Sequence, residues 1–131
     1  MSIIITESQF EVNQKHYPSF SFKELACQET GEIALPIDFL KELQKLRDAY
    51  GKPMIITSGY RSPKHSIESK KSSPGYHTQG AVDVAVSGED AIQLLKTALN
   101  LGWTGIGINT PSFIHLDRRP NPTIWTVSYT H

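Results

Sequence analysis

Residues 77–86 read HTQGAVDVAV, and the interpretation of the chain starts from this stretch. Valines alternate with alanines and Asp83 over residues 81–86, a period of two that predicts a strand with one carboxylate on a face of small residues. His77 precedes Asp83 by six positions, with a glycine between them. A loop that enters a strand explains the glycine. It does not explain why two side chains that bind metal ions flank it.

A helix and a strand are expected before this stretch. Residues 36–51 have apolar side chains at helical spacing, with Pro36 suited to the first turn, Asp38 near the positive end of the dipole and Gly51 as a stop. Residues 54–57 form a short apolar run that predicts a buried strand. Residues 1–19 have no clear periodicity, and we expect them to form an irregular N-terminal arm or a short strand.

Further elements are expected after it. Residues 87–102 predict a second helix, with Ser87 as N-cap and Asp90 completing a capping box. Residues 103–108, 112–119 and 123–129 predict three more strands. This order predicts an α+β fold with a mainly antiparallel sheet flanked by helices, in a single domain over residues 1–131.

Composition excludes several classes of function. Lys+Arg and Asp+Glu both number 13 in 131 residues, so no net charge points to nucleic acid as a partner. No segment resembles a signal peptide or a membrane span, so we expect synthesis in the cytoplasm and no membrane insertion. Cys27 is the only cysteine, which excludes a cysteine-rich zinc site and predicts a small buried side chain.

Three residues form a candidate metal site. His77 opens the strand of residues 81–86, Asp83 lies on its polar face, and His115 lies in a strand that is able to pair beside it. Two imidazoles and a carboxylate suit Zn²⁺ and leave a fourth position open, as in catalytic sites. The alternative is that each histidine only makes hydrogen bonds and that Asp83 pairs with Arg61 or Arg118.

Five stretches in register resemble the zinc-dependent D-alanyl-D-alanine peptidases of the M15 type, in the C-terminal-domain branch. They read FKELAC, LQKLRDAYGKPMIITSGYRSPKH, HTQGAVDV, GWTGIGI and FIHLDRRP, and they span about four fifths of the chain. The resemblance implies an α+β fold around one zinc ion per chain. It also implies hydrolysis of peptides of the bacterial cell wall.

The resemblance also implies residue roles. His77, Asp83 and His115 match the zinc ligands, and Arg61 matches the arginine that faces the substrate. Some relatives carry an acidic residue three positions before the last histidine, where this chain has Ser112, so Asp117 is the candidate general base here. The alternatives for Asp117 are orientation of His115 and pairing with Arg119 or Arg61. Tyr76 and Trp125 are candidates to line a substrate groove, with packing as the alternative, whereas His16, His65 and His131 are expected to be exposed.

One departure leaves two functions open. The family motif has one residue more between the glycine and the alanine than HTQGAVD has, so the reach from His77 to Asp83 is shorter. The first function is a zinc carboxypeptidase or endolysin-like endopeptidase that acts on peptidoglycan stem peptides at the cell wall. The alternative is a metal-free module with a phage structural or wall-binding role. If the chain is phage-encoded, virion proteins are further partners.

Overall fold

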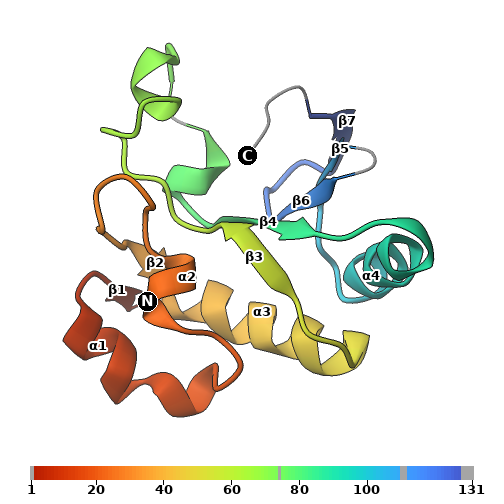
Figure 1. Ribbon diagram of the computed structural model, residues 1–131, viewed down its shortest axis with the longest axis horizontal. Helices are drawn as coiled ribbons and strands as arrows, with labels where there is room; N and C mark the ends of the chain where they lie inside the picture. Colours follow the sequence, from red (N-terminus) through yellow and green to blue (C-terminus); the bar gives the residue numbers. More distant parts are fainter. Residues whose placement is uncertain (1, 74, 110–111, 128–131) are drawn as a thin grey trace.

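A five-stranded sheet forms the centre of the part of the chain that the computed structural model describes, which is residues 2–73, 75–109 and 112–127 (Figure 1). Its strand order is β3-β4-β6-β5-β7. Antiparallel pairing joins β3 to β4, β4 to β6 and β6 to β5, whereas β7 runs parallel to β5. The predicted α+β class with a mainly antiparallel sheet is confirmed. The strands are β3 (Ile55–Ser58), β4 (Ala81–Ala85), β5 (Gly105–Asn109), β6 (Phe113–Asp117) and β7 (Thr123–Thr126).

Helix α3 (Ile37–Tyr50) confirms the helix predicted over residues 36–51. Asp38 lies in its first turn, and the Gly51 amide caps its end by donating to the carbonyl of Arg47 at 3.0 Å. One side of the helix is buried, as the apolar stripe requires. Its buried side chains are Phe39, Leu40, Leu43, Gln44 and Leu46.

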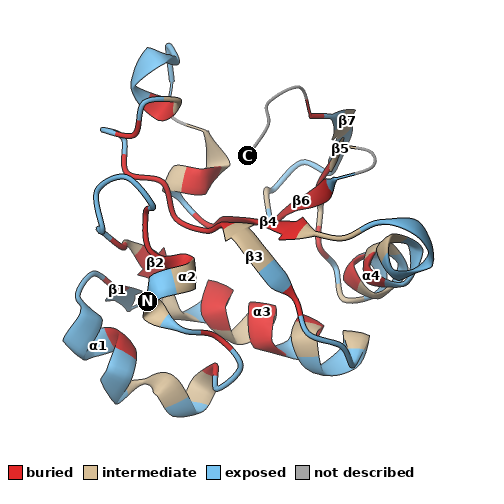
Figure 2. Ribbon diagram, in the orientation of Figure 1, coloured by how far each residue is buried: buried red, intermediate tan, exposed pale blue. Residues whose placement is uncertain are grey.

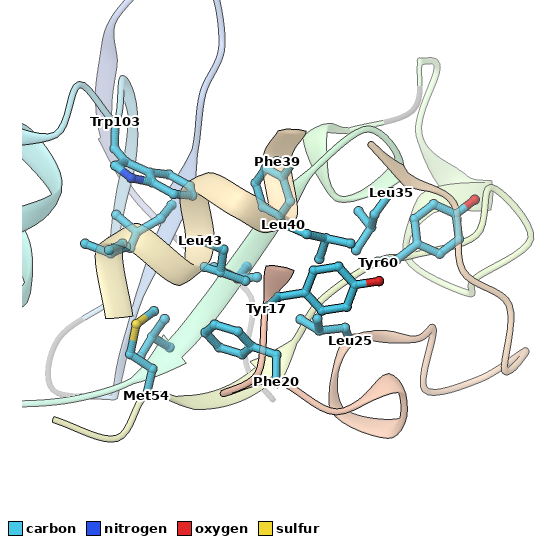
Figure 3. Close-up of a cluster of buried hydrophobic side chains, with 14 of the residues drawn as sticks. Tyr17, Phe20, Leu25, Leu35, Phe39, Leu40, Leu43, Met54, Tyr60 and Trp103 are labelled. Carbon is cyan, nitrogen blue, oxygen red and sulfur yellow. The ribbon is translucent and has the colours of Figure 1, made fainter. Parts of the chain in front are cut away.

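The hydrophobic core lies between the helices and one face of the sheet (Figures 2 and 3). Val82 and Val84 of β4 and Leu116 of β6 supply the sheet side of this core. Figure 3 shows Leu40 and Leu43 of α3 close to aromatic side chains from the N-terminal segment, with Trp103 near one end of the helix. Because this face is covered, polar side chains of β4 and β6 are left for the opposite face.

Helix α4 (Gly88–Asn100) confirms the helix predicted over residues 87–102. Leu94 and Ala98 are buried, as expected, and Ser87 occupies the N-cap position. The predicted capping box is wrong, because the Ser87 side chain makes no cap hydrogen bond. No helix of the described residues is both long and apolar enough to cross a membrane.

The N-terminal segment is more ordered than predicted. The irregular arm expected over residues 1–19 is wrong for its described part, although the short strand that was the alternative is present. The reason is aromatic burial: Phe10 and Tyr17 are fully buried, and the Tyr17 hydroxyl donates to the carbonyl of Phe10 at 2.8 Å. The elements here are β1 (Ile3–Ile4), α1 (Glu7–Val12), η1 (Gln14–His16), α2 (Phe22–Leu25) and β2 (Leu35–Pro36), which pairs with β1.

Strand β3 is an edge strand, not the buried strand predicted at residues 54–57. Its only neighbour in the described sheet is β4, and Ile55 is 64% exposed. An apolar run alone does not distinguish a central strand from an edge strand.

The connection from β3 to β4 lies on the side of β4 opposite α3 (Figure 1). It contains two short 3₁₀ turns, η2 (Glu68–Lys70) and η3 (Tyr76–Thr78). Pro74 within it lies outside the described residues, as do residues 110–111, between the strands predicted over 103–108 and 112–119, and residues 128–129 of the last predicted strand.

Candidate metal centre

Strand register brings two of the candidate ligands face to face. Asp83 of β4 pairs directly with His115 of β6, and Ala81 pairs with Asp117. Alternation along each strand therefore puts Asp83, His115 and Asp117 on one face. This is the face that α3 leaves free, and the expected pairing of the two strands is confirmed.

The third candidate, His77, comes from η3, and Gly80 makes the turn from η3 into β4. Gly80 has φ +153°, a conformation that residues with a side chain rarely adopt. A Cβ at Gly80 would also lie 3.1 Å from the Phe39 ring. With this turn, and despite the short spacing in HTQGAVD, His77 Nε2 lies 3.1 Å from Asp83 Oδ1.

Three donor atoms converge at one point. His115 Nδ1 lies 3.0 Å from Asp83 Oδ1 and 3.2 Å from His77 Nε2. Within the described residues, these three side chains are the group of histidines, cysteines and carboxylates whose donor atoms all lie within 4.8 Å of one another. All three are buried, with exposed fractions of 4% or less. Two imidazole nitrogens and one carboxylate oxygen are a donor set that fits one divalent metal ion.

Each candidate ligand is held from behind. His77 Nδ1 lies 2.8 Å from the Gly59 carbonyl, which accepts its proton, so Nε2, the nitrogen that faces Asp83, is the atom that would bind a cation. His115 Nε2 lies 2.7 Å from Asp117 Oδ2, which in the same way leaves Nδ1 as the ligand atom. Asp83 Oδ2 lies 3.7 Å from Arg61 Nη2. Partners of this kind fix the tautomer and orientation of metal ligands, and they support the fit of this donor set to a metal.

The two histidines differ in their acid–base properties. Burial lowers the pKa of His77 below its usual value and outweighs the contact with Asp83. Burial acts in the same direction on His115, but hydrogen bonds with Asp117 and Asp83 outweigh it and raise the pKa of His115. His77 is therefore the more readily neutral of the two.

Asp117 makes the contacts of an orienting residue. It is fully buried, and Arg119 binds it through Nε at 2.9 Å and Nη2 at 2.6 Å. Burial acts to raise the pKa of Asp117, but the hydrogen bonds from Arg119 and His115 outweigh it and hold the pKa well below its usual range. Both the pairing with Arg119 and the orientation of His115 named as alternatives are present. The general-base role stays a prediction.

Two glycines of β5 make room for these side chains. Gly105 pairs with Asp117 and Gly107 pairs with His115. A Cβ at Gly105 would overlap the Asp117 carboxylate, and a Cβ at Gly107 would lie 3.0 Å from the His115 Cβ. Asp117 therefore requires a glycine at position 105, whereas at position 107 the nearest obstacle is the Val127 side chain, at 2.6 Å from the added Cβ.

Arg119 is stacked between two aromatic rings. Its guanidinium carbon lies 4.3 Å from the ring centroid of Tyr76 and 4.3 Å from that of Trp125. The Trp125 ring lies 5.1 Å from the His115 ring. Tyr76 and Trp125 thus pack against Arg119, which binds Asp117, the partner of His115. Packing was the alternative given for both residues. A substrate contact of Tyr76 stays a prediction.

Arg61 is buried behind Asp83. It is 3% exposed, and its Nη1 lies 3.2 Å from Glu68 Oε2. Its ion pair with Asp83 is the alternative named for both residues, whereas a substrate-facing role of Arg61 stays a prediction. Glu68 was missed, because it lies in the run KHSIESKK of residues 64–71, whose simplest interpretation is a solvated loop. That interpretation is wrong for Glu68, which is 2% exposed.

His65 and His16 do not belong to the group of three candidate ligands. His65 is buried, so its predicted exposure is wrong, and its Nε2 lies 3.2 Å from the carboxylate of Glu29. His16 is half-buried, and His131 lies outside the described residues. Cys27 is buried with a free thiol, as predicted.

A groove lies next to Tyr76 and Arg119, two residues that flank the centre, and none of the three candidate ligands lines it. Its volume is about 540 Å³, and it runs along the start of α3. Two carboxylates, Asp38 and Glu42, face it together with Arg118 and Arg119. A groove with both signs of charge suits a zwitterionic peptide. Its lining also includes Pro36, Phe39, Gln79, Gly80 and Pro120.

Comparisons with known proteins give a family. No curated protein and no solved structure matches the chain significantly. The family model described as Peptidase M15 matches residues 18–117, which contain His77, Asp83 and His115. Since this match covers more than half of the chain, the protein belongs to the peptidase M15 family.

Proposed function

We propose that this chain is a zinc-dependent peptidase that binds one zinc ion through His77 Nε2, Asp83 Oδ1 and His115 Nδ1. The observation that carries the proposal is the convergence of these three buried atoms, each ligand held from behind by Gly59, Arg61 or Asp117. When bound, zinc supplies Lewis acidity toward a peptide carbonyl and a water molecule. Three protein ligands leave a coordination position for these groups.

The chain's own residues prepare the site. The Gly59 carbonyl and Asp117 hold the protons of the two imidazoles away from the centre, so that the lone pairs of the inward nitrogens point toward the position of the zinc ion. Burial excludes bulk water, which strengthens the interactions of Asp83 with a cation. Asp117 as general base would have to give up its contacts with His115 and Arg119, and orientation of His115 is the role that its geometry supports.

We further propose peptidoglycan stem peptides as substrates, in a carboxypeptidase or an endolysin-like reaction at the bacterial cell wall. The family and the groove with both charges next to Tyr76 and Arg119 support a peptide substrate. The resemblance to D-alanyl-D-alanine peptidases supports the cell-wall origin of that peptide. Nucleic acid is not a partner in this proposal, because the chain has no net charge.

Metal content is the first test. The untagged protein, purified without chelator, should contain about one zinc per chain by elemental analysis, and His77→Ala should contain none. His16→Ala is the matched control, because His16 is half-buried and does not belong to the group of three candidate ligands. A wild-type protein that stays free of zinc in excess zinc would sink the proposal and leave the metal-free module.

Cleavage is the second test. Zinc-loaded protein should release new peptide termini from purified peptidoglycan, and mass spectrometry of the products identifies the bond. Loss of cleavage in His77→Ala, with cleavage intact in His16→Ala, is the expected result. Zinc binding with no cleavage, together with co-sedimentation with cell walls, would instead favour the wall-binding alternative.

A further inference from the structure

Glu68 is a buried carboxylate from a loop that is otherwise polar. It lies in η2, and its side chain makes three contacts: Oε2 with Arg61 Nη1 at 3.2 Å and with Lys71 Nζ at 3.1 Å, and Oε1 with the Gly75 amide at 2.8 Å. Its exposed fraction is 2%. A carboxylate this deeply buried normally has a partner of opposite charge.

Arg61 joins Glu68 to the metal centre. Its Nη1 contacts Glu68, and its Nη2 lies 3.7 Å from Asp83 Oδ2. Asp83 Oδ2 therefore faces Arg61, and Asp83 Oδ1 faces both histidines. One guanidinium is shared by two buried carboxylates, of which only Asp83 faces the centre.

The charges explain why Glu68 is needed. A buried guanidinium behind a metal ligand repels a divalent cation, and this repulsion is strong where water is excluded. The Glu68 carboxylate offsets the charge of Arg61 while leaving it bound to Asp83. Without Glu68, Arg61 would draw Asp83 toward itself and oppose the cation.

We propose that Glu68 is a positioning residue of the metal centre, which neutralises and holds Arg61 so that Asp83 keeps Oδ1 turned toward His77 and His115. This inference rests on the proposed metal site. It also assigns the loop over residues 62–75 a role in metal binding through Glu68, which contacts Arg61 and is not one of the three candidate ligands. Gly75 supports the arrangement, because a Cβ there would lie 2.7 Å from Lys71 Nζ and 3.1 Å from Glu68 Oε1.

The test is zinc affinity, measured for the full chain by competition with a chromophoric chelator at neutral pH. Glu68→Gln keeps the shape of the side chain and removes its charge, and zinc should bind about tenfold or more weakly, as for other partners of metal ligands. In the Co²⁺-loaded protein, the visible spectrum should shift as Asp83 moves.

Glu29→Gln is the matched control for loosening of the same loop. Glu29 holds that loop through the Ser66 amide at 2.9 Å and through His65. Its charge acts on Arg61 only at a distance, since no described hydrogen bond or ion pair joins Glu29 to Arg61 or Asp83. Zinc affinity should stay within about twofold of the wild type. An equal loss in Glu29→Gln and Glu68→Gln would overturn the inference, since loop order alone would then explain both.

A double-mutant cycle with Arg61→Met tests the route. If Glu68 acts through Arg61, Glu68→Gln should have little effect on zinc affinity once Arg61 is Met. An equal loss in both backgrounds would overturn the proposed route. If Glu68→Gln does not fold, Glu68→Asp keeps the charge but withdraws it from Arg61. Zinc should then bind at least about threefold more weakly, and unchanged affinity would overturn the inference.

The two proposals fail in different ways. A wild-type protein that binds no zinc refutes the metal site itself. Zinc binding by the wild type that is unchanged in Glu68→Gln refutes only the role of Glu68.

Discussion

Gly105 has no side chain because the Asp117 carboxylate occupies the space where a Cβ would lie. We expect Gly105→Ala to push Asp117 away from His115, which costs about 1–3 kcal/mol in overpacking and weakens zinc binding about tenfold. Thermal unfolding and chelator competition measure the two effects.

The control for this change is Gly51→Ala at the end of α3. Gly51 has φ +76° and no atom within 4 Å of a Cβ, so an alanine there meets only backbone strain of about 1–2 kcal/mol. It should lower the unfolding temperature and leave zinc affinity unchanged. Zinc affinity that falls equally in both variants would contradict the link from Gly105 to His115.

Glu68 should also make stability depend on pH. Burial acts to raise the pKa of Glu68, but the Gly75 amide, Lys71 and Arg61 outweigh it and lower the pKa below the usual 4.5. A lowered folded-state pKa adds stability that is present above the unfolded value and is lost as the pH falls through the folded value. The loss of unfolding free energy in Glu68→Gln should therefore be largest near neutral pH and shrink below about pH 4.5.

Urea unfolding of the metal-free proteins at several pH values measures this dependence. A difference between wild type and Glu68→Gln that stays constant with pH would show that Glu68 is not charged in the folded protein.

The residues of the candidate site were predictable from sequence where a local pattern marked them. His77, Asp83 and His115 were identified from strand alternation, spacing and family resemblance, and the structure brings them together. Glu68 was not identified, because a polar loop sequence does not reveal which of its charges turns inward. Glu68 is buried because it pairs with Arg61, which also pairs with Asp83. The pattern of the loop sequence contains no sign of this pairing.

At the scale of elements, Arg119 connects three of them. It follows β6, binds Asp117 through two nitrogens, and lies between Tyr76 of η3 and Trp125 of β7. Arg119→Lys loses the planar stack and the paired hydrogen bonds, which we expect to cost about 1–3 kcal/mol. The amide of Val127, which bonds to the Ile108 carbonyl, should then exchange its hydrogen faster.

Arg118→Lys is the neighbouring control. Arg118 is exposed and lies over the Trp103 ring at 5.2 Å, away from β7. Its replacement should leave exchange at Val127 unchanged. If both variants speed the exchange equally, the stack does not hold β7.

Elements were predicted best where a repeating pattern was long. Helices α3 and α4 have clear apolar sides, and both were located to within two residues at each end. The ordering of residues 2–19 was missed, because it depends on Phe10 and Tyr17 meeting a core built from distant residues. The edge position of β3 was missed for the same reason, since position in a sheet depends on partners and not on the strand's own sequence.

At the scale of the whole molecule, metal binding should raise stability, because the three ligands come from η3, β4 and β6 and meet only in the folded chain. At a free zinc concentration of one hundred times the dissociation constant, the gain is about 2.7 kcal/mol. For a chain of this size that is a rise of roughly 8 °C in unfolding temperature. Differential scanning calorimetry with and without a chelator measures it.

His77→Ala and Glu29→Gln are the controls for this rise in unfolding temperature. The first should show no rise with zinc, and the second should show the full rise from a lower starting temperature. A rise in His77→Ala equal to that of the wild type would place the stabilising zinc elsewhere.

The sheet was predictable in class but not in full order. Strand patterns and hairpin connections predicted a mainly antiparallel sheet, and three of its pairings are antiparallel. The parallel pairing of β7 with β5 was not predicted. Nothing in the sequence of residues 123–126 distinguishes it, because it follows from the path of residues 118–122 around Arg119.

The position of Trp125 has an optical consequence. The chain has two tryptophans, and Trp103 is 2% exposed in the core, where its ring meets Phe39. Trp125 instead lies against Arg119, with its ring centroid 5.1 Å from that of His115, so we expect its emission to change when that imidazole binds a cation. With Trp103 replaced by phenylalanine, the remaining indole becomes a built-in fluorophore, and the occupancy of the centre can be followed in real time without any added dye.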